Sequence, residues 1–99
     1  MAVISILNMH FDPARIDEAL VALHTTLIDT RAFNGNLGVD VVQNVKDPAH
    51  IQLVERWATV ADDDAYRAWR ASDDAPASLI APLLVERGPM TVATLLDEV

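Results

Sequence analysis

The residues with the clearest chemical potential in this chain lie between positions 55 and 69. Glu55 and Trp57 alternate along one apolar segment, and Tyr66 and Trp69 follow in the next segment. A carboxylate can remove a proton from an acidic C–H bond or a phenol, and aromatic rings can enclose a flat apolar ligand. The same side chains can also be core residues, with Glu55 in a salt bridge to Arg87 or to an arginine of a partner chain. The sequence leaves both interpretations open.

Further candidate residues lie near the two ends of the chain. Asn8 falls in an N-terminal apolar segment, where it either fixes a ligand or satisfies the backbone at a strand end. His10 shares the face of Asn8 and is a candidate base near neutral pH, or a solvated residue at the strand terminus. Arg56 and Arg87 are candidates to stabilise a developing negative charge, or are surface charges.

The histidines and the missing cysteines limit metal chemistry. The three histidines, His10, His24 and His50, are scattered and form no recognisable metal-binding motif. The chain contains no cysteine, which excludes disulfides, iron–sulfur clusters and cysteine-ligated zinc. We therefore expect no metal site, and the composition agrees with a cytoplasmic protein.

Composition predicts one small domain over residues 1–99 that has a partner. Apolar residues make up 52% of the chain, and this excess indicates that a second copy covers part of the surface in a homodimer. The net charge of −8 would repel nucleic acid. No apolar stretch approaches the ~20 residues of a membrane span, and the N-terminus does not resemble a signal peptide.

The elements that must position these residues follow from hydrophobic periodicity. We expect strands at residues 2–9, 38–45, 51–59 and 90–96, and helices at about 12–30 and 62–72. Asp12 and Pro13 predict the start of the first helix, and Asn34-Gly35-Asn36 predicts the turn after it. Residues 78–85 are expected to be partly helical, with an interruption at Pro82.

This order, βαββαβ, predicts an α+β fold of the ferredoxin-like type, with a four-stranded antiparallel sheet and both helices on one face. The first two strands are apolar on both faces. Strands of this kind are buried on both sides, so two sheets are expected to pack face to face as a dimeric α+β barrel. That architecture predicts a cavity on the open face of the sheet.

The segments GVDVVQN, LVERW and AYRAW together resemble the antibiotic biosynthesis monooxygenase (ABM) family, in a match from about Ala2 to Leu95. The resemblance implies a ferredoxin-like subunit that dimerises into an α+β barrel. One branch of this family oxidises anthrone-like polyketides to quinones without a cofactor. Trp57 and Tyr66 match its tryptophan and tyrosine, whereas Leu53 replaces its asparagine.

A second branch degrades haem. Asn8 matches the asparagine of that branch, and Trp69 matches the tryptophan that packs against the haem. The axial histidine of the branch has no counterpart, because Leu79 lies in that region and no histidine follows His50. His10 or His24 would have to ligate the iron differently.

The resemblance and the residue chemistry together predict a small monooxygenase of antibiotic-biosynthesis type that acts on an electron-rich aromatic compound with O₂ and no cofactor. The expected pocket residues are Asn8, Trp57, Tyr66 and Trp69. The candidate base is His10 or Glu55, and Arg87 is a candidate anion stabiliser. The alternatives are a non-catalytic dimeric barrel that binds a small hydrophobic ligand, and a haem-binding or haem-degrading relative.

Overall fold

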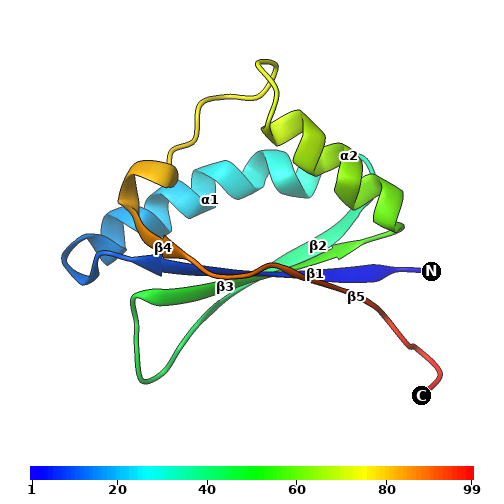
Figure 1. The fold of residues 1–99 in the computed structure, drawn as a ribbon, viewed down its shortest axis with the longest axis horizontal. Coiled ribbons are helices and arrows are strands. Elements are labelled where there is room, and N and C mark those ends of the chain that lie inside the picture. Colours follow the sequence, from blue (N-terminus) through cyan, green and yellow to red (C-terminus); the bar gives the residue numbers. More distant parts are fainter.

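The structure, a computed structural model, describes residues 1–99 as a sheet with two helices on one of its faces (Figure 1). The strands are β1 (Val3–Phe11), β2 (Asn36–Gln43), β3 (His50–Trp57), β4 (Leu84–Arg87) and β5 (Thr91–Thr94). The helices are α1 (Ile16–Ala32) and α2 (Val60–Arg70), with short 3₁₀ helices at Pro13–Arg15 and Ala81–Leu83. The expected ferredoxin-like α+β fold is confirmed. Neither helix is long and apolar enough to cross a membrane.

The sheet is antiparallel and open, with the strand order β2-β3-β1-β4. β5 also pairs with β1, at the end near Val3, whereas β4 pairs with the end near Phe11. The fourth strand expected at residues 90–96 corresponds to β5, and β4 is an additional strand that follows the 3₁₀ helix in the segment expected to be partly helical. The sequence missed β4 because it is a short strand without clear alternation, and only its long-range pairing with β1 defines it.

The first helical segment begins where the sequence predicted. The Asp12 carboxylate accepts a hydrogen bond from the amide of Ala14 at 2.9 Å and so caps the turn that leads into α1. Leu23 and Leu27 are buried against the sheet, whereas Leu20 is 36% exposed. Ala19 is buried with them, since it lies one helical turn before Leu23.

The turn after α1 contacts the start of α2. Gly35 has a positive φ of +89°, which favours glycine. Its carbonyl accepts a hydrogen bond from the amide of Ala58 at 2.8 Å, so the turn is tied to the end of β3. Thr59 caps α2, because its hydroxyl accepts from the amide of Asp62 at 3.1 Å and donates to the Asp62 carboxylate at 3.0 Å.

Replacing Gly35 with alanine is expected to lower the free energy of unfolding by about 2 kcal/mol or more. A Cβ at this position would collide with the Asp62 side chain, and the positive φ would be strained as well. Urea denaturation followed by circular dichroism measures the change. Gly38→Ala is the matched comparison, because it also has a positive φ but open space around its Cβ. Equal losses for the two variants would show that the contact with Asp62 contributes nothing.

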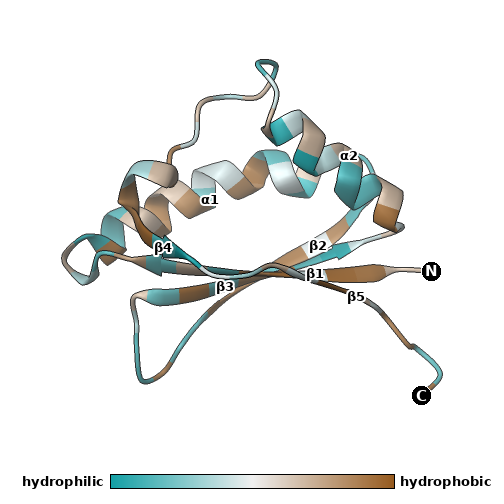
Figure 2. Cartoon of the chain, in the orientation of Figure 1, coloured by the Kyte–Doolittle hydropathy of each residue, from teal (hydrophilic) through white to brown (hydrophobic).

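Two buried clusters fill the space between the sheet and the helices. The larger one lies under α1 and includes Met9, Phe11, Leu23, Leu27, Ile51, Leu53 and Leu83. The smaller one lies under α2 and consists of Val3, Trp57 and Tyr66, with Phe33 and Trp69 packed against it. Figure 2 shows the apolar residues in brown along the strands and α1. The helix-facing side of β1 and β3 is thus core, while no helix covers the opposite face.

Candidate functional site

A cavity of about 490 Å³ lies on the helix-covered side of the sheet. Its walls come from β1, β3, α1, α2 and the segment 76–80 that follows α2. Figure 1 shows this segment arching away from the sheet between α2 and β4. The cavity expected on the open face, between two packed sheets, stays a prediction, whereas this cavity lies within one chain. The open face carries only a smaller pocket of about 190 Å³.

The cavity has an apolar interior and several charged groups. Leu23, Leu27 and Leu53 contribute apolar surface, together with Ile80 from the segment after α2. The ionisable residues in the wall are Asp29, Glu55, Tyr66, Arg67, Arg70 and Arg87. An apolar chamber with a few convergent polar groups is typical of a small-molecule site.

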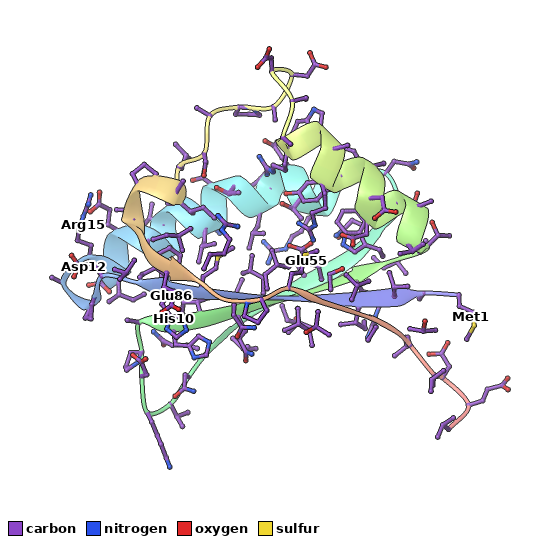
Figure 3. The ribbon with its side chains drawn as sticks, viewed as in Figure 1. Met1, His10, Asp12, Arg15, Glu55 and Glu86 are labelled. Atoms are coloured by element: carbon purple, nitrogen blue, oxygen red, sulfur yellow. The ribbon has the colours of Figure 1, made fainter.

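Glu55 is a buried carboxylate in the wall of the cavity, and its side chain is directed to the helix-covered face (Figure 3). Its Oε1 pairs with Nη2 of Arg67 at 2.5 Å and accepts a hydrogen bond from Nε1 of Trp57 at 3.3 Å. The salt bridge expected from the sequence forms, but Arg87 was the wrong partner. α2 lies over β3 and brings Arg67 to Glu55, whereas β4 lies beyond β1 from β3.

Asp63 is a second buried carboxylate at the same cation. Its Oδ1 lies 3.0 Å from Nη2 of Arg67 and makes no well-aligned hydrogen bond. Glu55 and Asp63 are each only 1% exposed, so two buried negative charges share one guanidinium. The sequence analysis missed this cluster, although the i, i+4 spacing of Asp63 and Arg67 on a predicted helix was a usable signal.

Tyr66 joins α1 and α2 through its hydroxyl group. Its Oη lies 2.5 Å from Oγ1 of Thr30 and accepts a hydrogen bond from Nε of Arg70 at 2.6 Å. Tyr66 is 3% exposed and lines the cavity, as do Thr30 and Arg70. The sequence analysis assigned no role to Thr30 or Arg70. Arg70 lies four residues after Tyr66 on one helix face, but nothing in the sequence indicates the contact with Thr30.

Trp57 and Trp69 lie outside the cavity wall. The Trp57 ring is fully buried, with its centroid 5.1 Å from that of Tyr66 and 6.3 Å from that of Phe33. Trp69 packs against Phe33 and Tyr66 at 5.5 and 6.1 Å. Both tryptophans therefore pack against the Tyr66 ring without lining the cavity. Direct contact of either ring with a substrate stays a sequence-based prediction.

Trp57→Phe is expected to lower the free energy of unfolding by about 1–3 kcal/mol, because the smaller ring leaves a void and no longer donates to Glu55. Thermal unfolding of the two proteins measures the loss. Trp69→Phe should cost less, since Trp69 is only partly buried. If Trp57→Phe changed ligand affinity but left stability unaltered, Trp57 would be a pocket residue after all.

The N-terminal candidates face the open side of the sheet. Oδ1 of Asn8 accepts from Nε2 of Gln52 and contacts Nε2 of His50, both at 3.0 Å. His10 stacks on His50 with ring centroids 4.1 Å apart. Figure 3 shows His10 on the side of the sheet opposite Glu55. Strand alternation explains the separation, since even-numbered residues of β1 point away from the helices.

The predicted site residues are therefore only partly brought together. Glu55, Tyr66 and Arg87 border the cavity, and no histidine does. Asn8 also borders it as part of β1, although its side chain makes its hydrogen bonds on the open face. Arg87 is exposed at the rim. No cluster of three or more histidine, cysteine, aspartate or glutamate residues is placed to hold a metal ion. The arrangement offers a buried carboxylate, Glu55, and a phenol, Tyr66, with cations beside both, while Asp29 is an exposed carboxylate in the same wall.

The architecture defines the class: an antiparallel sheet with two helices on one face and a ligand-sized cavity between them, as in ferredoxin-like α+β domains. The sequence profile of the family described as "Antibiotic biosynthesis monooxygenase" matches residues 2–77, and the chain belongs to this family. A comparison with curated proteins gave no match.

Solved structures share the fold over almost the whole chain. An antibiotic biosynthesis monooxygenase superposes with a TM-score of 0.79 at 22% identity, over 95% of this chain and 98% of that one. Rv0793 from Mycobacterium tuberculosis gives a TM-score of 0.78 at 22% identity, over 99% and 98%. A conserved protein from Methanosarcina mazei Go1 gives 0.78 at 16% identity, over 93% and 90%. At these identities the likeness concerns the fold.

Proposed function

We propose that this protein is a monooxygenase that oxidises an electron-rich aromatic small molecule, such as an anthrone or quinol, with O₂ and without a cofactor. The observation that carries the proposal is the buried Glu55 carboxylate in the wall of an apolar cavity. Membership of the monooxygenase family supports the reaction class. The cavity volume of about 490 Å³ suits a ligand of drug-like size.

Glu55 is the proposed base. It removes a proton from the substrate, and the resulting carbanion or phenolate supplies the electrons that reduce O₂. For an anthrone, one oxygen atom of O₂ becomes the new carbonyl oxygen of the quinone, and the other leaves as water with both hydrogens of the methylene group. The apolar walls exclude bulk water, and the hydrogen bonds to Glu55 hold its orientation.

The placement of the side chains favours Glu55 over His10 as this base. A base must lie within hydrogen-bond reach of the proton that it removes. Glu55 lines the cavity, while His10 lies on the opposite face of the sheet and stacks on His50. Tyr66 remains the proposed contact for the substrate oxygen, because its hydroxyl group borders the same space.

The test is oxygen consumption by the purified protein with 1,8-dihydroxyanthrone, measured against the uncatalysed reaction and against heat-denatured protein. We expect protein-dependent O₂ uptake that persists in the presence of a metal chelator, together with formation of the quinone. Binding of the anthrone without O₂ uptake would instead identify a non-catalytic binding protein. A Soret band on titration with haemin would favour the haem-binding alternative, although no histidine of this chain lines the cavity.

The homodimer is also part of the proposal. The open face of the sheet presents Ile4, Ile6 and Val54 in half-buried positions without any helix over them. Face-to-face packing of two sheets would bury these residues, as in the expected α+β barrel. Size-exclusion chromatography with light scattering should give twice the mass of 10.8 kDa. A monomer at micromolar concentration would contradict the proposed dimer.

A further inference from the structure

Arg70 is a half-buried cation in the cavity wall that has no acidic partner. The ion pairs of the chain join Arg15 to Glu18, and Arg67 to both Glu55 and Asp63. Arg70 contacts only neutral groups, through its hydrogen bonds to Tyr66 and to α1. A guanidinium that is partly removed from water without a counter-ion favours the binding of an anion.

The position of the Arg70 side chain is well defined by these contacts. Nε donates to Oη of Tyr66 at 2.6 Å, and Nη2 donates to the carbonyl oxygen of Thr26 at 2.9 Å. The guanidinium carbon also lies 4.9 Å from the centroid of the Trp69 ring. Because the group is already held, a ligand that binds it need not order a mobile side chain.

Donor groups of Arg70 remain available for a ligand. A guanidinium has five N–H groups, and the hydrogen bonds to protein use Nε and Nη2 but not Nη1. Arg87 also borders the cavity, but it is exposed and no side-chain hydrogen bond fixes it. The two cations therefore differ, since Arg70 is held in place beside the Tyr66 hydroxyl.

We propose that Arg70 and Tyr66 form an anion-binding site for one ionised oxygen of the substrate. The preferred substrate class is then an aromatic acid or phenolate, and a neutral aromatic compound of the same shape binds more weakly. This inference rests on the proposed function, because it places the substrate in the same cavity. Most of the net charge of −8 lies outside the cavity, where salt screens it beyond ~10 Å. Of the two carboxylates in the cavity wall, Glu55 is paired with Arg67 and Asp29 is exposed to water, so the contact with Arg70 decides the preference.

The experiment compares 2-naphthoate with its neutral isostere 2-naphthamide by isothermal titration calorimetry. Wild-type protein should bind 2-naphthoate at least ~10-fold more tightly. Arg70→Gln should weaken 2-naphthoate binding by about 10- to 100-fold and change 2-naphthamide binding less than threefold. Arg70→Lys should recover part of the loss, because it keeps the charge but not the planar fork. Arg15→Gln is the charge-matched control, since Arg15 is exposed and outside the cavity.

Several results would overturn the inference. Equal or weaker binding of 2-naphthoate by the wild type would do so without any variant, which matters if Arg70→Gln fails to fold. An equal loss for both ligands in folded Arg70→Gln would show a merely structural role. If only Arg87→Gln weakened the binding of 2-naphthoate, the anion would bind at Arg87, at the exposed edge of the cavity, and not at Arg70.

The inference and the proposed function fail separately. Oxygen uptake by a protein that does not prefer 2-naphthoate over 2-naphthamide would contradict only the proposed anion site. A clear preference for 2-naphthoate in a protein that consumes no oxygen with any anthrone would contradict only the proposed monooxygenase reaction.

Discussion

Glu55→Gln is expected to lower kcat/KM for anthrone-dependent oxygen consumption by about 100-fold or more. The amide keeps the size of the side chain and can still accept a hydrogen bond from Trp57, but it cannot take a proton from the substrate. Initial rates at several anthrone concentrations in an oxygen electrode measure the effect. Binding of 2-naphthoate should change far less than the rate, because the anion is assigned to Arg70.

Two controls make this result specific to Glu55. Glu18→Gln removes an equal charge from an exposed ion pair at the start of α1 and should leave the rate unchanged. His10→Gln should also retain activity, because His10 lies on the open face of the sheet. If His10→Gln abolished oxygen consumption while Glu55→Gln did not, the base would be the histidine and the proposed site would be on the wrong face.

Arg67→Leu is expected to lower the free energy of unfolding by about 3 kcal/mol. The change leaves Glu55 and Asp63 buried without their shared cation. The side chain of Arg67 keeps 27% of its surface exposed, so solvent screening places the cost near the lower end of the range for a broken buried ion pair. Urea denaturation measures the loss, and the midpoint of thermal unfolding should fall by about 12 °C or more.

The matched variants separate the buried cluster from surface charge. Arg15→Leu breaks an exposed ion pair and should cost less than about 1 kcal/mol. Adding Asp63→Asn to Arg67→Leu should recover part of the stability, because one of the two uncompensated carboxylates disappears. A loss no greater than that of Arg15→Leu would mean that Glu55 and Asp63 do not depend on Arg67.

Strand alternation correctly predicts which candidate residues share a face within one strand. Glu55 and Trp57 share one face of β3, and Asn8 and His10 share one face of β1, as the sequence indicates. The register of the two strands decides that these faces are opposite ones, because Leu7 and Leu53 are partners in the pairing. No local pattern contains that register, so the sequence grouped His10 with residues on the far side of the sheet.

The partner of Glu55 shows the same limit. The sequence correctly indicates that a buried carboxylate needs a cation, since an unpaired charge in an apolar interior is too costly. It cannot choose between Arg67 and Arg87, because the choice depends on how α2 lies across β3. The i, i+4 spacing of Asp63 and Arg67 was readable, whereas the contact of Arg67 with a strand residue was not.

The sequence by itself determined what neighbouring residues decide: the order of the elements from β1 to α2, the capped start at Asp12, the glycine turn at Gly35 and membership of the family. Interactions over a few residues set these features. The tertiary structure alone decided the side of the sheet that holds the cavity, the pairing of Glu55 with Arg67 and the contact of Tyr66 with Thr30. These depend on contacts between distant segments, whose geometry is set by the packing of the helices on the sheet.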